Sequence, residues 1–162
     1  MTDSDSGEFV LREAGLSDIP QVVDVWTEFM QFHADLNPTF TRGPEAEEAF
    51  AKHLEDRINS EKSLLLVAQQ HETIVGYCLA GMAERPPVFV DREYGMIDDL
   101  AVVGDKRRQG IGEALLKATE DWFRMRGTCR VELQLVTANE VASGFWTKMG
   151  YERYMERRFK TV

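Results

Sequence analysis

The chain has 162 residues and a formal net charge of −9, so it is long enough for one domain with its own hydrophobic core and is poorly suited to binding nucleic acid. The acidity is concentrated at the start: residues 1–60 hold 13 Asp and Glu and 4 Lys and Arg, whereas residues 61–162 hold 15 of each. No apolar run approaches the ~20 residues that a membrane span needs, and the polar start is unlike a signal peptide.

We therefore expect a cytoplasmic protein with a flexible acidic tail at residues 1–8 and a single domain at residues 9–162. The acidic first third has two interpretations. It keeps the protein soluble, or it provides a field that attracts a cationic substrate.

The first third predicts one strand and two helices. Residues 9–12 are a short strand candidate. Ser17 can cap a helix with Pro20 in its first turn, and this helix should end before residues 37–38, because proline disfavours helical geometry in the residue before it. Residues 44–58, rich in Glu and Ala, predict the second helix.

A hairpin follows. Residues 63–70 and 73–83 are rich in apolar and β-branched residues, and the polar residues 71–72 between them predict its turn. Two prolines at residues 86–87 interrupt the chain, and another apolar strand candidate spans residues 96–103. The middle of the chain should therefore contribute three consecutive strands.

The two cysteines, Cys78 and Cys129, lie in separate strand-like segments and lack the CxxC or His spacing of a metal site. We predict buried, reduced thiols and no metal site.

A basic Gly-x-Gly turn follows the strand at residues 96–103. Three cations at residues 106–108 precede Gly110 and Gly112, and a strong amphipathic helix begins there. Glycines leave the backbone open to a ligand, and the first N–H groups of a helix attract anions. The pattern predicts a cradle for phosphate groups.

Two familiar phosphate-binding patterns do not fit this cradle. The P-loop requires Gly-Lys-Ser/Thr, and no such sequence follows Gly112. The dinucleotide fingerprint requires a third glycine where this chain has Leu115. An Arg/Gln-x-x-Gly-x-Gly/Ala pattern does fit, through Arg107, Gly110 and Gly112. An ordinary strand-to-helix turn is the alternative interpretation.

The C-terminal part alternates helices and strands. Apolar residues at spacings of three and four predict a helix from Ile111 that ends at Gly127. Residues 130–136 and 151–159 predict strands, and residues 139–149 predict a helix. The element order is β-α-α-β-β-β-α-β-α-β, which predicts an α+β fold with a mixed, mostly antiparallel sheet and helices on both faces. The strands that flank the cradle helix should be parallel.

Three segments together resemble the GNAT superfamily of acyl-CoA N-acyltransferases. The Arg107, Gly110 and Gly112 pattern is similar to the family's coenzyme A pyrophosphate loop. Residues 97–102 resemble its central strand, and residues 139–151 resemble its Asn-x-x-Ala-x-x-Phe/Leu-Tyr-x-x-x-Gly-Phe/Tyr segment. The three occur in the family's order and spacing. The resemblance implies a GNAT-like fold and acetyl-CoA as the cosubstrate.

The resemblance also implies the cofactor contacts. In the family the central strand and the next one splay apart at a bulge, and the pantetheine arm lies in the gap and bonds to strand backbone. The resemblance implies that Leu100, Ala101 and Val102 would offer those backbone groups here. Asn139 would bond the pantetheine arm, cap a helix, or do both. The pyrophosphate would be held, mainly through backbone N–H groups, by Arg107, Arg108, Gln109, Gly110, Ile111, Gly112 and Glu113.

Asp98 and Asp99 are the candidate catalytic bases. An alkyl amine has a pKa of ~10 and must lose a proton when it attacks a thioester. On a regular strand the two carboxylates face opposite sides, so that one reaches the substrate cleft and the other is structural. The pair is similar to the Glu-Asp pair of diamine acetyltransferases, which implies Asp98 as the base. Alternatively, both carboxylates merely bond backbone and arginines at the bulge.

One residue departs from the family. Trp146 stands where many members have a Tyr that protonates the leaving thiolate, and an indole cannot act as an acid at neutral pH. Water, Tyr151 or Tyr154 could replace that Tyr, coenzyme A could leave as the thiolate, and Trp146 could equally belong to the core. His33 is a candidate for the acceptor site, although a lone helical histidine is more often surface or core.

The resemblance implies an N-acetyltransferase that transfers an acetyl group from acetyl-CoA to a primary amine, and the acidic first third favours a cationic small molecule as the acceptor. A protein N-terminal or lysine acetyltransferase and a non-catalytic acyl-CoA sensor are the alternatives. The predicted partner is the amine acceptor, with no nucleic acid and no membrane, and a homodimer is left open.

Overall fold

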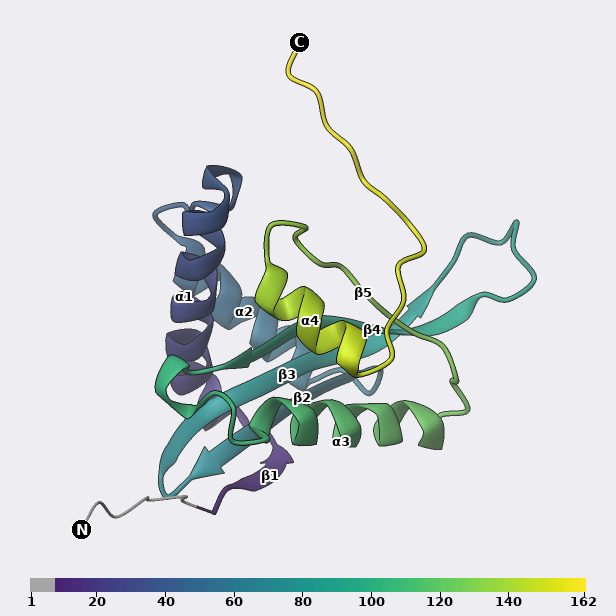
Figure 1. Cartoon of the computed structure of the whole chain (residues 1–162). Coiled ribbons are helices and arrows are strands. Elements are labelled where there is room, and N and C mark those ends of the chain that lie inside the picture. The colour runs from purple at the N-terminus through teal and green to yellow at the C-terminus, as the bar shows by residue number, and fades with distance from the viewer. Residues whose placement is uncertain (1–7) are drawn as a thin grey trace.

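A five-stranded sheet forms the centre of the protein in the computed structural model, which describes residues 8–162 (Figure 1). The predicted tail at residues 1–8 lies, apart from its last residue, outside the described residues. The strands lie side by side in chain order: β1 (Val10–Glu13), β2 (Ser63–Gln70), β3 (Thr73–Glu84), β4 (Glu93–Val102) and β5 (Val131–Leu133).

The sheet is mixed and mostly antiparallel, as the sequence predicts. Neighbouring strands from β1 to β4 are antiparallel, and β4 and β5 are parallel. A parallel pair requires a crossover connection, and α3 (Ile111–Met125) supplies it.

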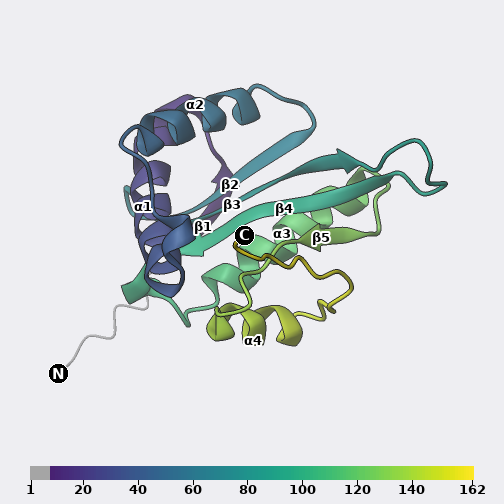
Figure 2. The same ribbon diagram turned by 90° about the horizontal axis from the view of Figure 1, so that it is seen from above.

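The other helices are α1 (Ile19–Leu36), α2 (Ala46–Ile58) and α4 (Glu140–Lys148). Figure 2 shows α1 and α2 on one face of the sheet and α3 and α4 on the other. The predicted helices on both faces are therefore confirmed.

The start of α1 differs from the sequence prediction. A short 3-10 turn, Leu16–Asp18, precedes the helix, and Asp18 rather than Ser17 stands at its N-cap position. The buried Asp18 carboxylate accepts hydrogen bonds from the Gly15 N–H at 2.8 Å and from Arg12 Nη1 at 2.7 Å. The predicted Ser17 cap is wrong, because Asp18 organises this turn.

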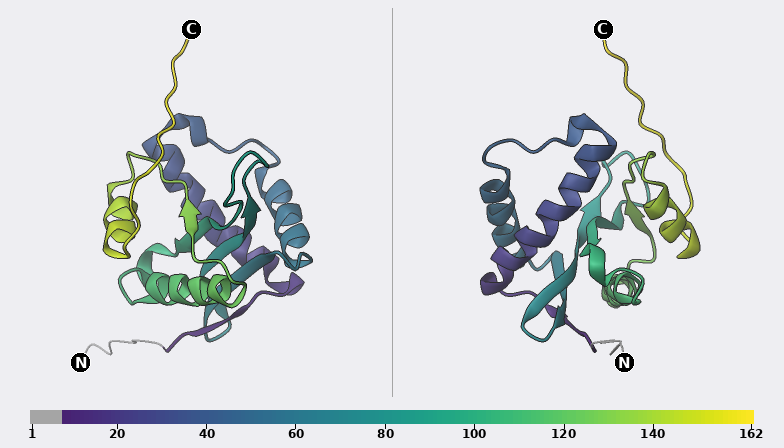
Figure 3. Two further views of the ribbon diagram at one scale, coloured as in Figure 1. Left: turned by 90° about the vertical axis from the view of Figure 1, so that its right-hand side faces the viewer. Right: turned by 60° about the vertical axis from the view of Figure 1, so that its left-hand side comes forward.

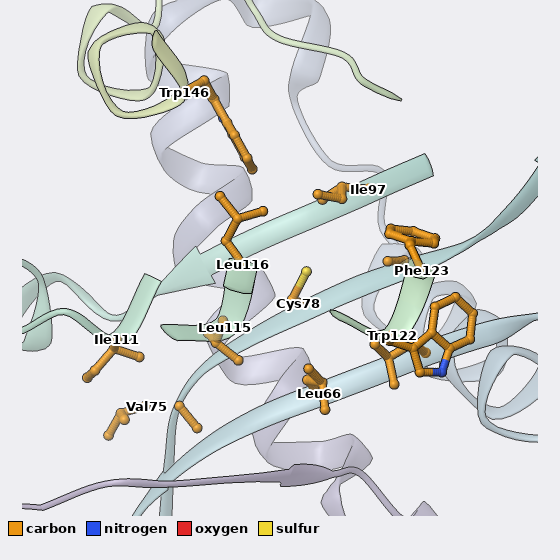
Figure 4. Packing of buried hydrophobic residues seen from close by; sticks show 13 residues of the cluster. Leu66, Val75, Cys78, Ile97, Ile111, Leu115, Leu116, Trp122, Phe123 and Trp146 are labelled. Atoms are coloured by element: carbon orange, nitrogen blue, oxygen red, sulfur yellow. The ribbon is translucent and has the colours of Figure 1, made fainter. Parts of the chain in front are cut away.

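Two hydrophobic clusters lie on the two faces of the sheet. Successive strand residues point to opposite faces, so Leu66 enters one cluster and Val67 the other. The first cluster lies beneath α3 and α4 and includes Leu66, Cys78, Ile97, Ile111, Leu115 and Trp146 (Figure 4). The second lies beneath α1 and α2 and includes Val22, Leu54, Val67, Tyr77 and Ala101.

Strands β4 and β5 separate part of the way along β4. Only residues 95–97 of β4 pair with β5, although β4 continues to Val102. The register between β3 and β4 shifts between Leu79 and Ala80, so Asp98 is the extra residue of a β-bulge. Because a bulge bends its strand, the second half of β4 has no partner on the β5 side.

The predicted last strand, residues 151–159, is wrong, because none of residues 151–162 pairs with the sheet of its own chain. Figures 1 and 3 show this segment leaving the body of the protein. The side that would face the core alternates apolar with charged residues: Tyr151, Arg153, Met155, Arg157 and Phe159. Such a mixed side gives the segment little to bury against its own core.

The two cysteines have different environments. Cys78 is buried, as the sequence predicts. Cys129 is exposed, so the prediction of a buried thiol is wrong there. It precedes β5 at the edge of the sheet, where the predicted strand at residues 130–136 shortens to Val131–Leu133.

Candidate functional site

The gap between β4 and β5 receives backbone groups of β4. The Val103 N–H donates to the Val75 carbonyl of β3 at 2.9 Å, and the direction of backbone groups alternates along a strand. Leu100 and Val102 therefore direct their N–H and C=O groups into the gap, whereas those of Ala101 face β3. A ligand in the gap would meet the backbone of Leu100 and Val102 rather than that of Ala101.

The start of α3 lies beyond the end of β4. Gly110 has a φ of 81° and precedes the first helical residue, and Arg108 has a φ of 64°. The Gly110 carbonyl accepts the Ala114 N–H at 3.0 Å, so the N–H groups of residues 111–113 have no partner within the helix. These groups and the positive end of the helix can hold a phosphate group.

Gly112 is not required by the packing of the protein. A β-carbon there would lie 3.8 Å from the Phe145 ring and 3.8 Å from Val102 Cγ2, which are ordinary contact distances. A small, uncharged residue at position 112 keeps the backbone N–H groups beside the end of β4 accessible to a pyrophosphate.

The polar residues of the loop before α3 have different surroundings. Arg107 Nε donates to the Val102 carbonyl at 3.0 Å, and the Arg107 guanidinium lies 5.9 Å from the Phe32 ring. Arg107 therefore links the loop to β4 and α1. Arg108 and Gln109 are exposed.

Three further predicted site residues have structural contacts. The Ile111 side chain is buried in the first cluster, so only its backbone can face a ligand. The Glu113 carboxylate lies 3.7 Å from Lys148 Nζ of α4. Asn139 is buried, and its Oδ1 accepts the Ala142 N–H at 3.0 Å. The predicted helix cap at Asn139 is confirmed, and this cap does not involve the amide Nδ2.

Asp98 and Asp99 lie on the same face of the sheet, the face that α1 and α2 cover. Asp98 Oδ2 lies 2.7 Å from Arg57 Nη1 of α2. Asp99 Oδ2 accepts a 3.0 Å hydrogen bond from the hydroxyl of Tyr77, a residue of the cluster beneath α1 and α2. The prediction that the carboxylates face opposite sides is wrong, because Asp98 is the bulge residue and a bulge interrupts the alternation.

The two carboxylates differ in electrostatic environment. Asp98 is paired with Arg57, and its side chain is 38% exposed. Burial raises the pKa of Asp99 from 3.8 to about 6; the Tyr77 hydroxyl counteracts this shift, and the neighbouring charge of Asp98 adds to it. Asp99 can therefore exchange a proton near neutral pH.

Trp146 belongs to the core rather than to an open site. It is 9% exposed and packs edge-on against Phe145 and Tyr151, with ring centroids 5.1 Å apart in both pairs. The two tyrosines considered as proton donors are bonded to carboxylates. Tyr151 donates to a glutamate of α3 at 2.9 Å, and Tyr154 donates to one of β5 at 2.6 Å.

Sequence reasoning missed Arg57 and Tyr77, the partners of the carboxylate pair. No motif marks Arg57, because its partner Asp98 lies 41 residues away and only the fold brings the two together. His33 of α1, a candidate from the sequence, is buried, and its Nδ1–H donates to the Phe29 carbonyl at 2.8 Å. Burial is the main cause of the raised pKa of Asp99, and the nearby His33 acts in the opposite direction.

Comparison with known proteins adds a family and a set of similar folds. The family model described as the acetyltransferase (GNAT) family matches residues 26–151. A tetramutant of the BH1408 protein from Bacillus halodurans is 23% identical, covers 94% of this chain and 99% of that chain, and has a TM-score of 0.86.

Two further solved structures contain coenzyme A or its acetyl form. A predicted acetyltransferase with acetyl-CoA from Clostridium acetobutylicum is 13% identical over 95% of this chain and 96% of that chain, with a TM-score of 0.78. The aminoglycoside N-acetyltransferase AAC(6')-Iy in complex with CoA is 12% identical over 96% of this chain and 95% of that chain, with a TM-score of 0.75. At these identities the likeness shows the fold, and the ligands agree with the acetyl-CoA that the sequence predicts.

Within residues 8–162, no cluster of three or more His, Cys, Asp or Glu is placed to hold a metal ion. Within the same part of the chain, no helix combines the length and the apolar character that a membrane crossing requires.

Proposed function

The chain belongs to the acetyltransferase (GNAT) family, and we propose that it transfers the acetyl group of acetyl-CoA to a primary amine of a small, cationic molecule. One observation carries this proposal. Three features lie near the place where β4 separates from β5: a gap lined by backbone groups of β4, the loop that leads into α3, and the adjacent carboxylates Asp98 and Asp99. A cradle for the cofactor and a source of bases therefore occur side by side.

The residues around the gap fit the chemical groups of coenzyme A. The N–H groups of residues 111–113 would hold the pyrophosphate, with positive charge added by Arg108. The backbone of Leu100 and the N–H of Val102, whose carbonyl accepts Arg107 Nε, would bond the amides of the pantetheine arm from one side of the gap. Asn139 Nδ2 would do so from the other side, since the α4 cap uses only Oδ1.

Acetyl-CoA, when bound, supplies a thioester that a neutral amine can attack. An amine with a pKa of ~10 reaches the site protonated, so a group of the protein must accept its proton. The Leu100 N–H, directed into the gap, can donate to an oxygen on which negative charge develops. A thiol with a pKa of ~8.5 is an adequate leaving group as the thiolate, so no side-chain acid is assigned.

We assign the base to Asp98. Its side chain is 38% exposed, and the bond to Arg57 uses Oδ2 and leaves Oδ1 for a proton, taken directly or through water. Asp99 is the second candidate, because its pKa of about 6 lies closer to neutral pH.

The acidic first third supports a cationic acceptor. Residues 1–60 carry a net charge of −9 and include α1 and α2, which cover the face that carries Asp98 and Asp99. A negative field raises the local concentration of a cationic substrate. An aminoglycoside N-acetyltransferase, whose acceptor is an amine, shares the fold. A polyamine-like, aminoglycoside-like or lysine-containing acceptor fits these features.

A non-catalytic sensor of acyl-CoA is the second candidate function. Trp146 occupies the position of the family's usual tyrosine, and it lies in the core. A sensor would bind acetyl-CoA and release no thiol in the presence of any amine.

Thiol release from acetyl-CoA tests the proposal. The panel should contain polyamines, aminoglycosides, a lysine peptide, a peptide with a free N terminus and a neutral alcohol as the negative control. We expect turnover with cationic amines. We also expect kcat to rise with pH in a single step, as one group of the enzyme–substrate complex loses its proton. Binding of acetyl-CoA without turnover would favour the sensor, and turnover with the peptides alone would favour a protein acetyltransferase.

Two substitutions separate the candidate bases. Asp98→Asn should lower kcat by ~10²-fold or more while acetyl-CoA affinity changes little, because the amide cannot accept the proton. Asp99→Asn should leave most of kcat. The opposite result would make Asp99 the base, and two active variants would place the base elsewhere.

A further inference from the structure

We propose that Arg57 is a positioning residue: its guanidinium holds the Asp98 carboxylate so that Oδ1 can accept the proton of the acceptor amine, and Gly81 leaves the space in which the guanidinium lies. The inference rests on the proposed function, because it concerns the base of that reaction. Three features carry it: the bonds that fix the guanidinium, the space at Gly81, and the place of Asp98 in the β-bulge.

Arg57 reaches the sheet from the last turn of α2. It lies three residues after Leu54, which is buried in the cluster beneath α1 and α2, and residues three apart share one face of a helix. A cation also suits the C-terminal end of a helix. The Arg57 side chain is 19% exposed. The helix α2 therefore directs this cation onto the face of the sheet that carries Asp98 (Figure 2).

Two hydrogen bonds fix the Arg57 guanidinium. Its Nε donates to Ser63 Oγ of β2 at 2.7 Å, and its Nη1 donates to Asp98 Oδ2 of β4 at 2.7 Å. A guanidinium is planar, so bonds from two of its nitrogens set both its position and its orientation. The single ammonium of a lysine could not reproduce this arrangement. The side chain thus connects β2 to β4 across β3.

The strand β3 has a glycine where the guanidinium crosses it. Gly81 is the cross-strand partner of Ser63, and its φ is not positive, so the backbone conformation there does not require glycine. A β-carbon at position 81 would lie 2.8 Å from Arg57 Nη2, which is too close, and 3.0 Å from the Lys62 carbonyl oxygen. Glycine weakens the interior of a strand and often marks a close approach. The approach of the guanidinium accounts for this one.

The position of Asp98 makes such a support necessary. As the extra residue of the bulge it has no direct cross-strand partner on β3, and its side chain is 38% exposed. An unsupported carboxylate would rotate among several orientations. The bond to Arg57 selects one of them, since it uses Oδ2 and leaves Oδ1 for the proton. A base works efficiently only when it is held within hydrogen-bond reach of the proton that it accepts.

A purely structural ion pair is the alternative. Arg57 would then only fasten α2 to the sheet, and its loss would lower the free energy of unfolding without changing kcat. The ion pair of Arg12 with Asp18 provides a matched control. It also joins a strand to the start of a helix, with Nη1 and Oδ2 2.7 Å apart, and it lies on β1, an edge strand on the other side of the sheet from β4.

Steady-state thiol release tests the role of Arg57, with acetyl-CoA and the amine of the panel that the parent chain acetylates fastest. We expect Arg57→Gln to lower kcat by ~10-fold or more, while acetyl-CoA affinity changes less than about threefold. Arg12→Gln should lose stability in thermal unfolding and keep kcat. A folded Arg57→Gln variant whose kcat equals or exceeds that of the parent would overturn the proposal.

Gly81→Ala displaces the guanidinium without removing its charge. The added methyl group would conflict with Arg57 Nη2, and the end of a flexible side chain can move away at little cost to the fold, whereas the Lys62 carbonyl has to shift only slightly. We expect a folded variant whose kcat falls toward the Arg57→Gln value. An unchanged kcat would show that the position of the guanidinium does not matter, and would overturn the proposal even if Arg57→Gln did not fold.

A double-variant cycle shows whether Arg57 acts through Asp98. In the Asp98→Asn background there is no carboxylate to position, so Arg57→Gln should lower kcat by no more than about twofold further. An equal loss in both backgrounds would overturn the proposal.

Failure of the proposed function gives a different result. The parent chain would then turn over no amine, or Asp98→Asn would keep kcat, and either outcome would overturn this inference together with the assignment of the base. A loss of kcat in Asp98→Asn without a loss in Arg57→Gln would overturn the inference alone.

Discussion

Asp99 is held in a site that disfavours its charge. Burial raises its pKa from 3.8 to about 6, although the Tyr77 hydroxyl donates to it at 3.0 Å. Between about pH 4 and pH 6 the folded protein therefore keeps a proton that the unfolded chain has released. The contribution of Asp99 to the free energy of unfolding falls as the pH rises through this window and stays low above it.

Asp99→Asn should stabilise the protein at pH 8. The amide has no charge to bury, and its oxygen can still accept the Tyr77 hydroxyl. We expect the free energy of unfolding to rise by up to about 3 kcal/mol at pH 8 and the gain to fade as the pH falls to 4. Urea unfolding at the two pH values measures it. Asp98→Asn is the control, and a gain independent of pH would contradict the assignment.

Trp146 tests whether its indole takes part in the chemistry. Trp146→Phe keeps an aromatic ring against Phe145 and Tyr151 but fills less space in the first cluster. We expect a loss of about 1–2 kcal/mol in stability and a kcat within a few-fold of the parent value. Thermal unfolding and thiol release measure the two effects. A folded variant that binds acetyl-CoA and has lost turnover would show that the indole N–H matters.

The two glycines at the start of α3 have different roles: the backbone conformation requires Gly110, whereas Gly112 matters for ligand binding. Gly110 has a φ of 81°, so any side chain there adds strain, whereas position 112 has room for a β-carbon. Gly112→Asp should fold well, since an acidic residue suits the first turn of a helix, yet its charge should lower acetyl-CoA affinity at least tenfold. Calorimetry measures it. Gly112→Ala is the control and should keep both fold and affinity; equal affinity in the two variants would place the nucleotide elsewhere.

Sequence patterns predict correctly the helices and turns that depend on residues close together in the chain. The apolar stripe of α3 and the polar turn between β2 and β3 depend on residues close in sequence, and both appear in the structure. The bulge at Asp98 depends on how β3 and β4 pair, which no spacing in the sequence reveals. The faces of Asp98 and Asp99 were therefore predicted wrongly, and the contribution of Arg57 from α2 was missed.

The last strand shows the same limit at the level of a whole element. The alternating pattern of residues 151–159 resembles a strand, and the backbone of that segment leaves the body of the protein. Such a pattern forms a strand only where a sheet edge is available to pair with it. The spacing of apolar residues within the segment does not reveal whether such an edge exists.

At the scale of the whole molecule, charge is divided between the two halves of the site. The helices α1 and α2 belong to the part that carries −9, and they cover the face with Asp98 and Asp99. The basic residues 106–108 lie in the loop before α3, where the phosphate groups of acetyl-CoA would bind. The acidic side of the site would attract a cationic acceptor, and the basic side would attract the phosphate groups of acetyl-CoA.

Salt dependence of the acceptor KM tests this division. Charges on the protein surface are screened over ~10 Å at 0.1 M salt and over ~3 Å at 1 M. For a cationic acceptor steered by α1 and α2, KM should rise several-fold between low and high salt while kcat stays nearly constant. Thiol release at a series of KCl concentrations measures both constants. A polyamine should respond more strongly than a monoamine of similar length, because the attraction grows with the number of positive charges. If both acceptors give the same salt-independent KM, the acidity of residues 1–60 does not steer the substrate, and solubility is its remaining role.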